Sequence, residues 1–387
     1  MAKEIEKELF QLQKLGVKEG DLIITNLPTS STLVNLLFAS MHIGAIFFPL
    51  NPRWPNLAVQ EMLAQFSPTL FVSSSGMEKR VAQKTTLSPS SVLVSTSGST
   101  GKPKIASISQ TCFFNNAKSA MIACDLKNMD GWRLSLPMHH VAGLSIVFRT
   151  LLAGARLIFD EKDLTTTHLS QVPAQLYLAW PIYPKLRCVL LGGGPITEVP
   201  KELPCLISYA MTEMASLIMT GRSPNTLRPV ENKEVKLASD GEILVRGDSL
   251  FEGYWDGKVL HKPFDQEGWF STKDLGHYDP TFGYSIVGRK DNQFVSGGEN
   301  IQPEEIEKEL LKIPGILEAL VGPRTHERFG KRPIAYIKQL NGPIDTVSLQ
   351  KELSKSLPNY KIPDAFFPLE EEPFLKRNRK KIFDDSK

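Results

Sequence analysis

The segment from Ser95 to Lys104, with the sequence STSGSTGKPK, combines hydroxyl side chains with two glycines and two lysines. Backbone amides made accessible by Gly98 and Gly101, together with hydroxyls and a lysine, can surround the oxygens of a phosphate group. The order G-x-x-x-x-G-K-[ST] of the kinase and GTPase phosphate loop is absent, and Pro103 stands where its helix would begin. The residue types therefore indicate phosphate binding, with a flexible polar loop as the alternative.

Two adjacent histidines, His139 and His140, lie within the largely apolar segment LPMHHVAGLSIVFR. Adjacent histidines are usually surface residues, but these apolar neighbours favour the wall of a pocket. A neutral imidazole at that place, with an ordinary pKa of about 6.5, could hydrogen-bond a carboxylate or control the access of a thiol. The two residues are therefore candidates for contact with an acidic substrate.

The segment STSGSTGKPK resembles the phosphate-binding signature of the adenylate-forming superfamily, which includes acyl-CoA synthetases, adenylation domains of peptide synthetases and luciferases. The resemblance runs from Asp21 to Ile382, with the signatures in the order of the family. It implies that the loop holds the β and γ phosphates of ATP. The loop residues that it assigns to the nucleotide are Ser95, Thr96, Ser97, Gly98, Ser99, Thr100, Gly101 and Lys104.

Residues 209–213, YAMTE, are similar to the family signature Y-G-x-T-E. The resemblance implies that Tyr209 packs on adenine, that Thr212 contacts the adenylate phosphate during catalysis, and that Glu213 holds Mg²⁺. A hard divalent ion prefers carboxylate and phosphate oxygens, and it neutralises the charge that builds up when a carboxylate attacks the α-phosphorus. A Thr-Glu pair by itself would be uninformative, so the order of the signatures supports this assignment.

Three glycines, Gly192, Gly193 and Gly194, directly follow the predicted strand RCVLL. The resemblance implies that this turn lets adenine and the acyl group approach the backbone closely, with Gly193 also contacting the acid. A tight connection between a strand and a helix is the alternative interpretation.

The tetrapeptide STKD, which ends at Asp274, resembles the T-G-D signature of the family. The resemblance implies that Asp274 accepts hydrogen bonds from the ribose hydroxyls and that Arg289 reaches the same sugar. Solvated surface charges are the alternative. Lys273 and Ala210 stand where glycine is common in the family.

The segment around the two histidines resembles the acid-side signature of the family. Its register places His140 at the position implied to act on the acid in catalysis, and His139 in a slot that is usually aromatic. Arg149, at the end of the segment, is the residue that we expect to pair with a second carboxylate on the substrate.

The segment GRKDNQFVSGGENIQPEEIE resembles a hinge followed by the start of a small mobile domain. The resemblance implies that Asp291 is the pivot and that the small domain rotates between two poses. One pose delivers Lys381, in the ending KRNRKKI, to the α-phosphate and the substrate carboxylate. The other pose delivers the loop Ser296, Gly297 and Gly298 to the pantetheine arm of coenzyme A. A solvated basic tail is the alternative for Lys381.

Short β-branched strands such as SVLVS and EILVRG alternate with helical patterns, so the predicted class is α/β. We expect a large multi-layer adenylation domain with mixed sheets over residues 1–290, and a small α+β domain over residues 291–387. The uncharged stretch from Leu33 to Leu50 is interrupted by Gly44 and Pro49, which favours a buried helix, a turn and a strand over a membrane span.

Charge and cysteine content exclude several classes of protein. The 45 basic and 42 acidic side chains leave a net charge of +3, too small for a nucleic-acid or anionic-membrane surface. The four cysteines form no CxxC pair and have no partners at zinc spacing, which predicts reduced and mostly buried thiols. The charged N-terminal helical pattern is unlike a signal peptide, so we expect a cytoplasmic protein.

These features together predict an ATP-dependent acid-CoA ligase that forms an acyl-adenylate, releases pyrophosphate and then makes a thioester. The ligands implied are ATP, Mg²⁺, coenzyme A and a small apolar or aromatic carboxylic acid. The alternatives are another acyl- or aryl-CoA ligase, an enzyme that loads a carrier-protein thiol, and a non-catalytic nucleotide-binding relative. No nucleic-acid partner and no stable membrane insertion are expected, and a homodimer is compatible with the prediction.

Overall fold

The computed structural model describes residues 1–82, 85–96, 103–178, 183–194, 196, 199–200, 202–340, 342–369 and 379–384. The chain divides into two compact units: unit 1 comprises residues 1–235 and 245–270, and unit 2 comprises residues 236–244 and 271–387. Residues 236–244 and 271–290 thus group with the C-terminal part of the chain. The boundary predicted at residue 290 marks the expected pivot of a rotating domain, and it is not defined by how compactly the residues pack. It therefore stays a prediction.

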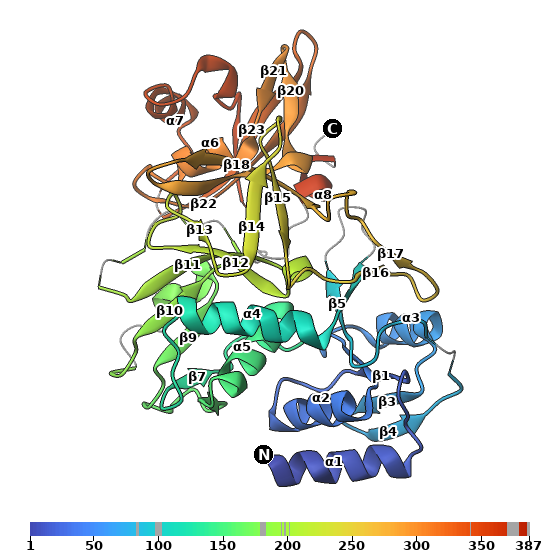
Figure 1. The fold of residues 1–387 in the computed structure, drawn as a ribbon. Coiled ribbons are helices and arrows are strands. Elements are labelled where there is room, and N and C mark those ends of the chain that lie inside the picture. The colour runs from blue at the N-terminus through green and yellow to red at the C-terminus, as the bar shows by residue number, and fades with distance from the viewer. Residues whose placement is uncertain are drawn as a thin grey trace. The chain divides into compact units, whose positions relative to one another are not determined.

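Helices occur in both units, as Figure 1 shows. Unit 1 contains α1 (Ala2–Lys14), α2 (Ser31–Ile43), α3 (Asn56–Phe66), α4 (Gln110–Ala123) and α5 (Val141–Leu152). Unit 2 contains α6 (Pro303–Leu310), α7 (Thr346–Leu353) and α8 (Arg379–Asp384). Short 3₁₀ helices are η1 (Pro173–Leu178), η2 (Thr212–Met214), η3 (Lys290–Asn292) and η4 (Asn359–Lys361).

Two large sheets make up most of unit 1. The first has the spatial order β17 (Leu260–His261), β16 (Gly253–Trp255), β6 (Lys104–Ile108), β5 (Val92–Thr96), β2 (Ile46–Pro49), β1 (Leu22–Thr25), β3 (Leu70–Ser73) and β4 (Gly76–Lys79). The second has the order β13 (Arg228–Pro229), β12 (Ser216–Gly221), β11 (Cys205–Met211), β10 (Cys188–Leu191), β9 (His168–Gln171), β7 (Gly131–Arg133) and β8 (Arg156–Ile158). Helices α4 and α5 pack on each other, and α1 packs on α2 (Figure 1).

Three smaller sheets complete the described part of the chain. One has the order β14 (Lys233–Leu237), β15 (Glu242–Gly247), β18 (Phe270–Asp279) and β19 (Gly283–Arg289). The others are the hairpin of β20 (Phe294–Ser296) with β21 (Glu299–Ile301), and the sheet of β22 (Ile316–His326), β23 (Gly330–Gln339) and β24 (Phe366–Pro368).

Parallel and antiparallel pairs occur in the same sheets, which confirms the predicted α/β class with mixed sheets. Strands β9, β10 and β11 run parallel, whereas β11 and β12 are antiparallel. In the first sheet β1 and β2 are parallel, whereas β5 and β6 form an antiparallel hairpin. That hairpin carries the predicted phosphate-binding loop at its tip.

The stretch from Leu33 to Leu50 forms the predicted helix, turn and strand. Ser30 begins α2 as its N-cap, because its Oγ accepts a hydrogen bond from the Leu33 amide at 3.3 Å. Gly44 ends the helix with φ of 82°, a left-handed conformation that costs glycine little. The strand β2 that follows is fully buried. No helix in the described ranges is long and apolar enough to cross a membrane.

The predicted small α+β module is present in unit 2. Helix α6 begins at Pro303, and its Ile306 and Leu310 are 0% exposed in a core shared with β22, β23 and α7. Helix α7 ends at Leu353, and Leu357 in the following turn is buried in the same core. The four cysteines of the chain are buried and free, as predicted.

Candidate functional site

The hairpin of β5 and β6 holds the two ends of the predicted phosphate loop together. Ser95 pairs with Ile105 and Thr96 pairs with Lys104, and the Thr96 hydroxyl donates to the Lys104 carbonyl oxygen at 3.2 Å. The loop residues Ser97, Gly98, Ser99, Thr100 and Gly101 lie outside the described part of the chain. The structure therefore positions the base of the loop, at Thr96 and Lys104.

Tyr254 joins this loop base to the Thr-Glu signature. Strand β16 pairs with β6, so that Tyr254 lies opposite Ala106. The ammonium of Lys104 lies 5.0 Å from the centre of the Tyr254 ring, and the Tyr254 hydroxyl donates to Oε1 of Glu213 at 2.5 Å. A cation from the phosphate loop and the predicted magnesium ligand thus contact one side chain. Sequence reasoning missed Tyr254, which belongs to no signature used above.

The turn that carries Thr212 and Glu213 is held by buried polar side chains of two helices. Asn116 of α4 donates from Nδ2 to the carbonyl oxygen of Met214 at 3.0 Å and to that of Leu217 at 2.9 Å. Ser145 of α5 donates to the carbonyl oxygen of Ala215 at 2.9 Å. Asn116 is 0% exposed and Ser145 is 3% exposed, so these bonds lie in a dry environment where they hold geometry well.

Glu213 suits a metal that is shared with a nucleotide. Its side chain is half-buried, and Tyr254 accounts for the hydrogen bond that its carboxylate makes within the described residues. No group of three or more His, Cys, Asp or Glu side chains that could hold a metal occurs in the same part of the chain. Mg²⁺ commonly uses one or two carboxylates and completes its shell with phosphate oxygens and water. The single carboxylate of Glu213 fits this way of binding Mg²⁺.

The three glycines form a turn directly after β10, as the sequence predicts. A Cβ atom at Gly192 would lie 2.2 Å from the Ser208 hydroxyl on β11, so only glycine fits between these strands. Gly193 has φ of +79°, and Gly194 lies beside Pro173. The partly buried ring of Tyr209 belongs to the same strand β11 as Ser208. The structure therefore brings the glycine turn and the predicted adenine-binding residue to neighbouring strands.

The two histidines lie at the start of α5. Their ring centres are 4.3 Å apart, and His140 is the N-cap residue of the helix. Burial, followed by the neighbouring His140 and Arg53, lowers the pKa of His139 to about 4. Partial burial lowers the pKa of His140 as well, although this residue keeps an exposed surface. Both imidazoles are therefore neutral at pH 7.

Acidification should test the neutral state of His139. The unfolded residue takes up a proton near pH 6.5, whereas the folded residue stays neutral down to about pH 4. The fold therefore loses stability as pH falls from 6.5 towards 4. When the pH falls from 7 to 5, the free energy of unfolding should decrease by about 1 kcal/mol more in the wild type than in His139→Phe, a difference that allows for solvent screening. Urea unfolding at both pH values measures this difference, and identical losses would refute the assignment.

Arg149 lies in the core of unit 1. It is 1% exposed, its guanidinium lies 4.8 Å from the centre of the Trp132 ring, and its Nε donates to the Ser145 carbonyl oxygen at 2.9 Å. Burial lowers the pKa of Arg149. This setting disfavours contact with a substrate carboxylate, a role that stays an untested prediction.

In unit 2, Asp274 and Arg289 face each other across β18 and β19. Arg289 donates from Nη1 to Oδ1 of Asp274 and to the Thr272 carbonyl oxygen, both at 3.0 Å. The two residues predicted to contact one ribose are thus adjacent. Lys273 has φ of +63°, a left-handed conformation in which an L side chain is strained, which explains why glycine is common there.

The predicted pivot and the predicted pantetheine loop follow in chain order. Asp291 lies in η3 and its carboxylate is 3.5 Å from Nη2 of Arg289. Ser296 ends β20, and Gly297 and Gly298 form the two-residue turn to β21, with φ of 58° and 92°. Two successive positive φ angles are typical of a type I′ hairpin turn. The Gly297 amide donates to the Phe329 carbonyl oxygen at 3.0 Å.

Lys381 belongs to the short helix α8, and its side chain lies outside the described part of the chain. The helix is anchored on both sides of Lys381. Arg379 pairs with Glu307 at 2.8 Å and also donates to the Val321 carbonyl oxygen. Phe383 is 8% exposed and packs so closely on Gly322 that a Cβ there would lie 2.4 Å from the ring. The structure therefore holds the backbone of Lys381 on β22.

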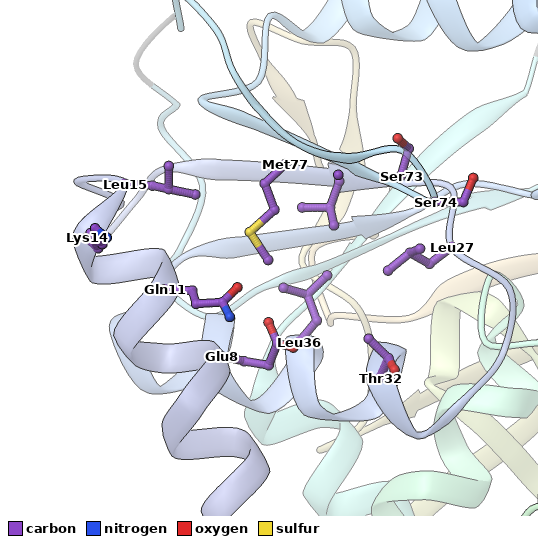
Figure 2. A pocket seen from close by; sticks show the side chains of 12 residues that line it. Glu8, Gln11, Lys14, Leu15, Leu27, Thr32, Leu36, Ser73, Ser74 and Met77 are labelled. Carbon is purple, nitrogen blue, oxygen red and sulfur yellow. The ribbon is translucent and has the colours of Figure 1, made fainter.

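A separate cavity of about 670 Å³ lies in unit 1, among α1, α2, β3 and β4. Figure 2 shows Glu8 and Gln11 on its α1 side, with Leu36 and Met77 nearby. Burial raises the pKa of Glu8. None of the residues assigned to the site from the sequence lines this cavity, so it is distinct from the candidate site.

Comparisons with known proteins agree with this arrangement. Residues 11–95 and 79–255 match the model of a family described as AMP-binding enzyme. The 2-succinylbenzoate–CoA ligase of Haemophilus influenzae is 32% identical, over 98% of this chain and 90% of its own length. The corresponding ligase of Escherichia coli is 33% identical, over 85% of this chain and 80% of its own length.

Solved structures of o-succinylbenzoate CoA synthetase from Bacillus subtilis are similar along nearly the whole chain. The complex with its acyl-adenylate intermediate is 26% identical with a TM-score of 0.83, covering 98% of this chain and 90% of that chain. The complex with ATP and a magnesium ion is 26% identical with a TM-score of 0.82, covering 96% of this chain and 90% of that chain.

Proposed function

Because this chain belongs to the family of AMP-binding enzymes, we propose that it joins 2-succinylbenzoate to coenzyme A with the conversion of ATP to AMP and pyrophosphate. The substrate assignment rests on ligases of that name that are at least 32% identical over most of their length. The observation in the structure that carries the chemistry is the contact of Tyr254 with both Lys104 and Glu213. It brings the base of a phosphate loop to a carboxylate suited to Mg²⁺.

In the first half-reaction the substrate carboxylate attacks the α-phosphorus of ATP, and pyrophosphate leaves. Lys104 adds positive charge at the base of the phosphate loop, and the hydroxyl of Thr212 contacts a phosphate oxygen. A bound Mg²⁺, held through Glu213, would supply charge neutralisation at the phosphates. Asn116 and Ser145 act indirectly, because they hold the turn in a fixed position.

The nucleoside and the acid are assigned to other residues. The glycine turn at Gly193 leaves the backbone open to a flat ring beside Tyr209, and Asp274 with Arg289 binds the ribose hydroxyls. His140, neutral at pH 7, hydrogen-bonds the acid from the start of α5.

In the second half-reaction the thiol of coenzyme A attacks the acyl carbon of the adenylate, and AMP leaves. The tight hairpin offers the open backbone of Gly298 to the pantetheine arm, whereas Gly297 packs against the ring of Phe329. The proposal includes rotation of the C-terminal domain about Asp291 between the two half-reactions, a cytoplasmic location and compatibility with a homodimer.

A panel of acids tests the substrate. With ATP, Mg²⁺ and coenzyme A, we expect kcat/KM for 2-succinylbenzoate to exceed that for benzoate or succinate by about 100-fold or more, because each lacks groups that the pocket must pair. Pyrophosphate release measures adenylation, and mass spectrometry identifies the thioester. Preference for another acid would overturn the substrate assignment. ATP binding without pyrophosphate release from any acid would favour a non-catalytic relative, and adenylation without a coenzyme A thioester would favour a carrier-protein acceptor.

A further inference from the structure

Glu252 binds the hairpin of β5 and β6, which carries the predicted phosphate loop. The residue directly precedes β16, and its side chain is half-buried. Its Oε2 accepts hydrogen bonds from the hydroxyls of Ser91 and Ser107, each at 2.9 Å. Its backbone amide donates to the Ser107 carbonyl oxygen, also at 2.9 Å. Glu252 therefore holds the hairpin with both its side chain and its backbone.

The two serines connect Glu252 to both strands of the hairpin. Ser91 directly precedes β5, Ser107 belongs to β6, and both are 0% exposed. The Ser91 hydroxyl also lies 2.8 Å from the Ser88 carbonyl oxygen, so that its proton is shared between two acceptors. Glu252 is the only acceptor that the described residues offer to the Ser107 hydroxyl. Because a buried hydroxyl without an acceptor is costly, these contacts fix the position of the carboxylate.

The residues on either side of Glu252 hold Glu213 at two points. The Phe251 amide donates to the Glu213 carbonyl oxygen at 2.8 Å, and the Tyr254 hydroxyl donates to Oε1 of Glu213 at 2.5 Å. The rings of Phe251 and Tyr254 contact each other edge to face, with their centres 4.8 Å apart. The segment 251–254 thus grips both the backbone and the carboxylate of Glu213, and Glu252 anchors that segment to the hairpin.

The contacts of Glu252 also fix how β16 lies on β6. Gly253 pairs with Ser107 and Tyr254 pairs with Ala106. A slip of one residue would turn Tyr254 to the other face of the sheet, away from Lys104 and Glu213. Strand β16 has only three residues, so few backbone hydrogen bonds resist such a slip. The side chain of Glu252 adds two hydrogen bonds that exist only in the observed register.

We propose that Glu252 is a positioning residue for adenylation, which holds β16 in register on the hairpin and thereby fixes Glu213 relative to Lys104. This role rests on the proposed function, in which Lys104 and Glu213 serve the phosphates and Mg²⁺. Glu252 acts through Phe251 and Tyr254. A nucleotide that engages the loop and a metal-binding carboxylate together requires their separation to be exact, because a displacement of about 1 Å can cost a factor of about 100 in rate.

Glu252→Ala should affect the two half-reactions differently. The kcat of pyrophosphate release should fall about tenfold, and the Mg²⁺ concentration for half-maximal release should rise about fivefold. Thioester formation from supplied acyl-adenylate and coenzyme A should stay within about twofold of the wild type, because it needs neither the triphosphate nor its metal. A loss of folded protein alone would lower both half-reactions equally and leave the Mg²⁺ requirement unchanged. That pattern would overturn the positioning role.

A binding measurement separates this role from the proposed reaction, because it needs no turnover. In calorimetric titrations of the wild type, Mg²⁺ should tighten the binding of ATP. In Glu252→Ala this gain should be about fivefold smaller, whereas ATP without Mg²⁺ should bind within about twofold of the wild type. An undiminished gain in the variant would overturn the positioning role. If the wild type released pyrophosphate with no acid, the proposed function would fail, and the titrations would still decide the role of Glu252.

Two comparisons test whether the hydrogen bonds are the cause. Glu252→Gln keeps an oxygen that can accept from both serines, so its kcat and Mg²⁺ requirement should stay within about twofold of the wild type. Ser107→Ala should raise the Mg²⁺ requirement about threefold, because one of the two side-chain hydrogen bonds is lost. The matched control is Ser40→Ala: Ser40 is also 0% exposed, but its hydroxyl donates within α2, to the Leu36 carbonyl oxygen at 2.7 Å. Equal impairment of Glu252→Gln and Glu252→Ala, or equal shifts in the two serine variants, would overturn the proposal.

A double variant tests whether Glu252 acts through Tyr254. If Glu252→Ala and Tyr254→Phe each slow adenylation about tenfold, independent effects would multiply to about 100-fold, whereas effects exerted through one contact should give a loss closer to tenfold. A loss of about 100-fold would refute action through Tyr254. Thermal unfolding shows which variants are folded. If Glu252→Ala does not fold, Ser107→Ala takes its place in the titrations and in the double variant, with the same outcomes for and against.

Discussion

Lys381→Ala should reduce pyrophosphate release from ATP and 2-succinylbenzoate by about 100-fold or more, because one preorganised cation at the α-phosphate is lost. The same variant should convert supplied acyl-adenylate and coenzyme A into thioester at a rate close to that of the wild type. Stopped assays of each half-reaction measure the two rates separately. The difference follows from the proposal that Lys381 acts in only one of two poses.

Lys380→Ala is the matched control, since it removes the same charge from the adjacent position of α8. The helix remains anchored in both variants, because Arg379 pairs with Glu307 and Phe383 packs on Gly322. We expect the Lys380 variant to adenylate at nearly the wild-type rate. Equal loss in both half-reactions of Lys381→Ala would contradict the rotation, and a larger loss in Lys380→Ala would move the role to that residue.

Glu213→Gln should lower the rate of adenylation about 100-fold and raise the Mg²⁺ concentration needed for half-maximal activity. The substitution keeps the size of the side chain and removes the negative charge that attracts the ion. Pyrophosphate release, measured over a series of Mg²⁺ concentrations with saturating ATP, separates the two effects. An unchanged response to Mg²⁺ would mean that Glu213 does not hold the metal.

The variant Tyr254→Phe tests how much the orientation of Glu213, apart from its charge, contributes to the rate of adenylation. It removes the hydroxyl that donates to Glu213 at 2.5 Å and keeps both the ring and the carboxylate. The loss of one hydrogen bond to a charged group should reduce adenylation by roughly tenfold, less than the loss of the carboxylate itself. If Tyr254→Phe and Glu213→Gln were equally impaired, the hydroxyl would have a direct part in the chemistry.

Local elements of the fold were predictable because the sequence carries their signals within a few residues. Ser30 and Gly44 mark the two ends of α2, and Pro303 marks the start of α6. Such signals depend on backbone conformation and on hydrogen bonds between near neighbours, so they act regardless of the rest of the chain. The burial of Leu357, which lies beyond the end of α7, comes from tertiary packing and has no such local signal.

The candidate site was only partly predictable. The residue types and order of the segments around Ser95, Thr212 and Asp274 indicated a nucleotide and a metal. Tyr254 was missed because it is 41 residues from Glu213 and makes contact only through the pairing of β16 with β6. The support of the Thr-Glu turn by Asn116 was missed for the same reason, since 98 residues separate it from Met214.

Arg149 shows most clearly what could not be predicted from the sequence. Its closeness in sequence to the histidines favoured a substrate contact, yet the same helix that presents His140 at its start turns Arg149 into the core. The sequence by itself determined the helix, the turns and the chemistry available at each signature, because those follow from residue types and short-range spacing. Only the tertiary structure decided which distant side chains share an environment, because strand order and helix packing, rather than sequence distance, bring Lys104, Tyr254 and Glu213 together.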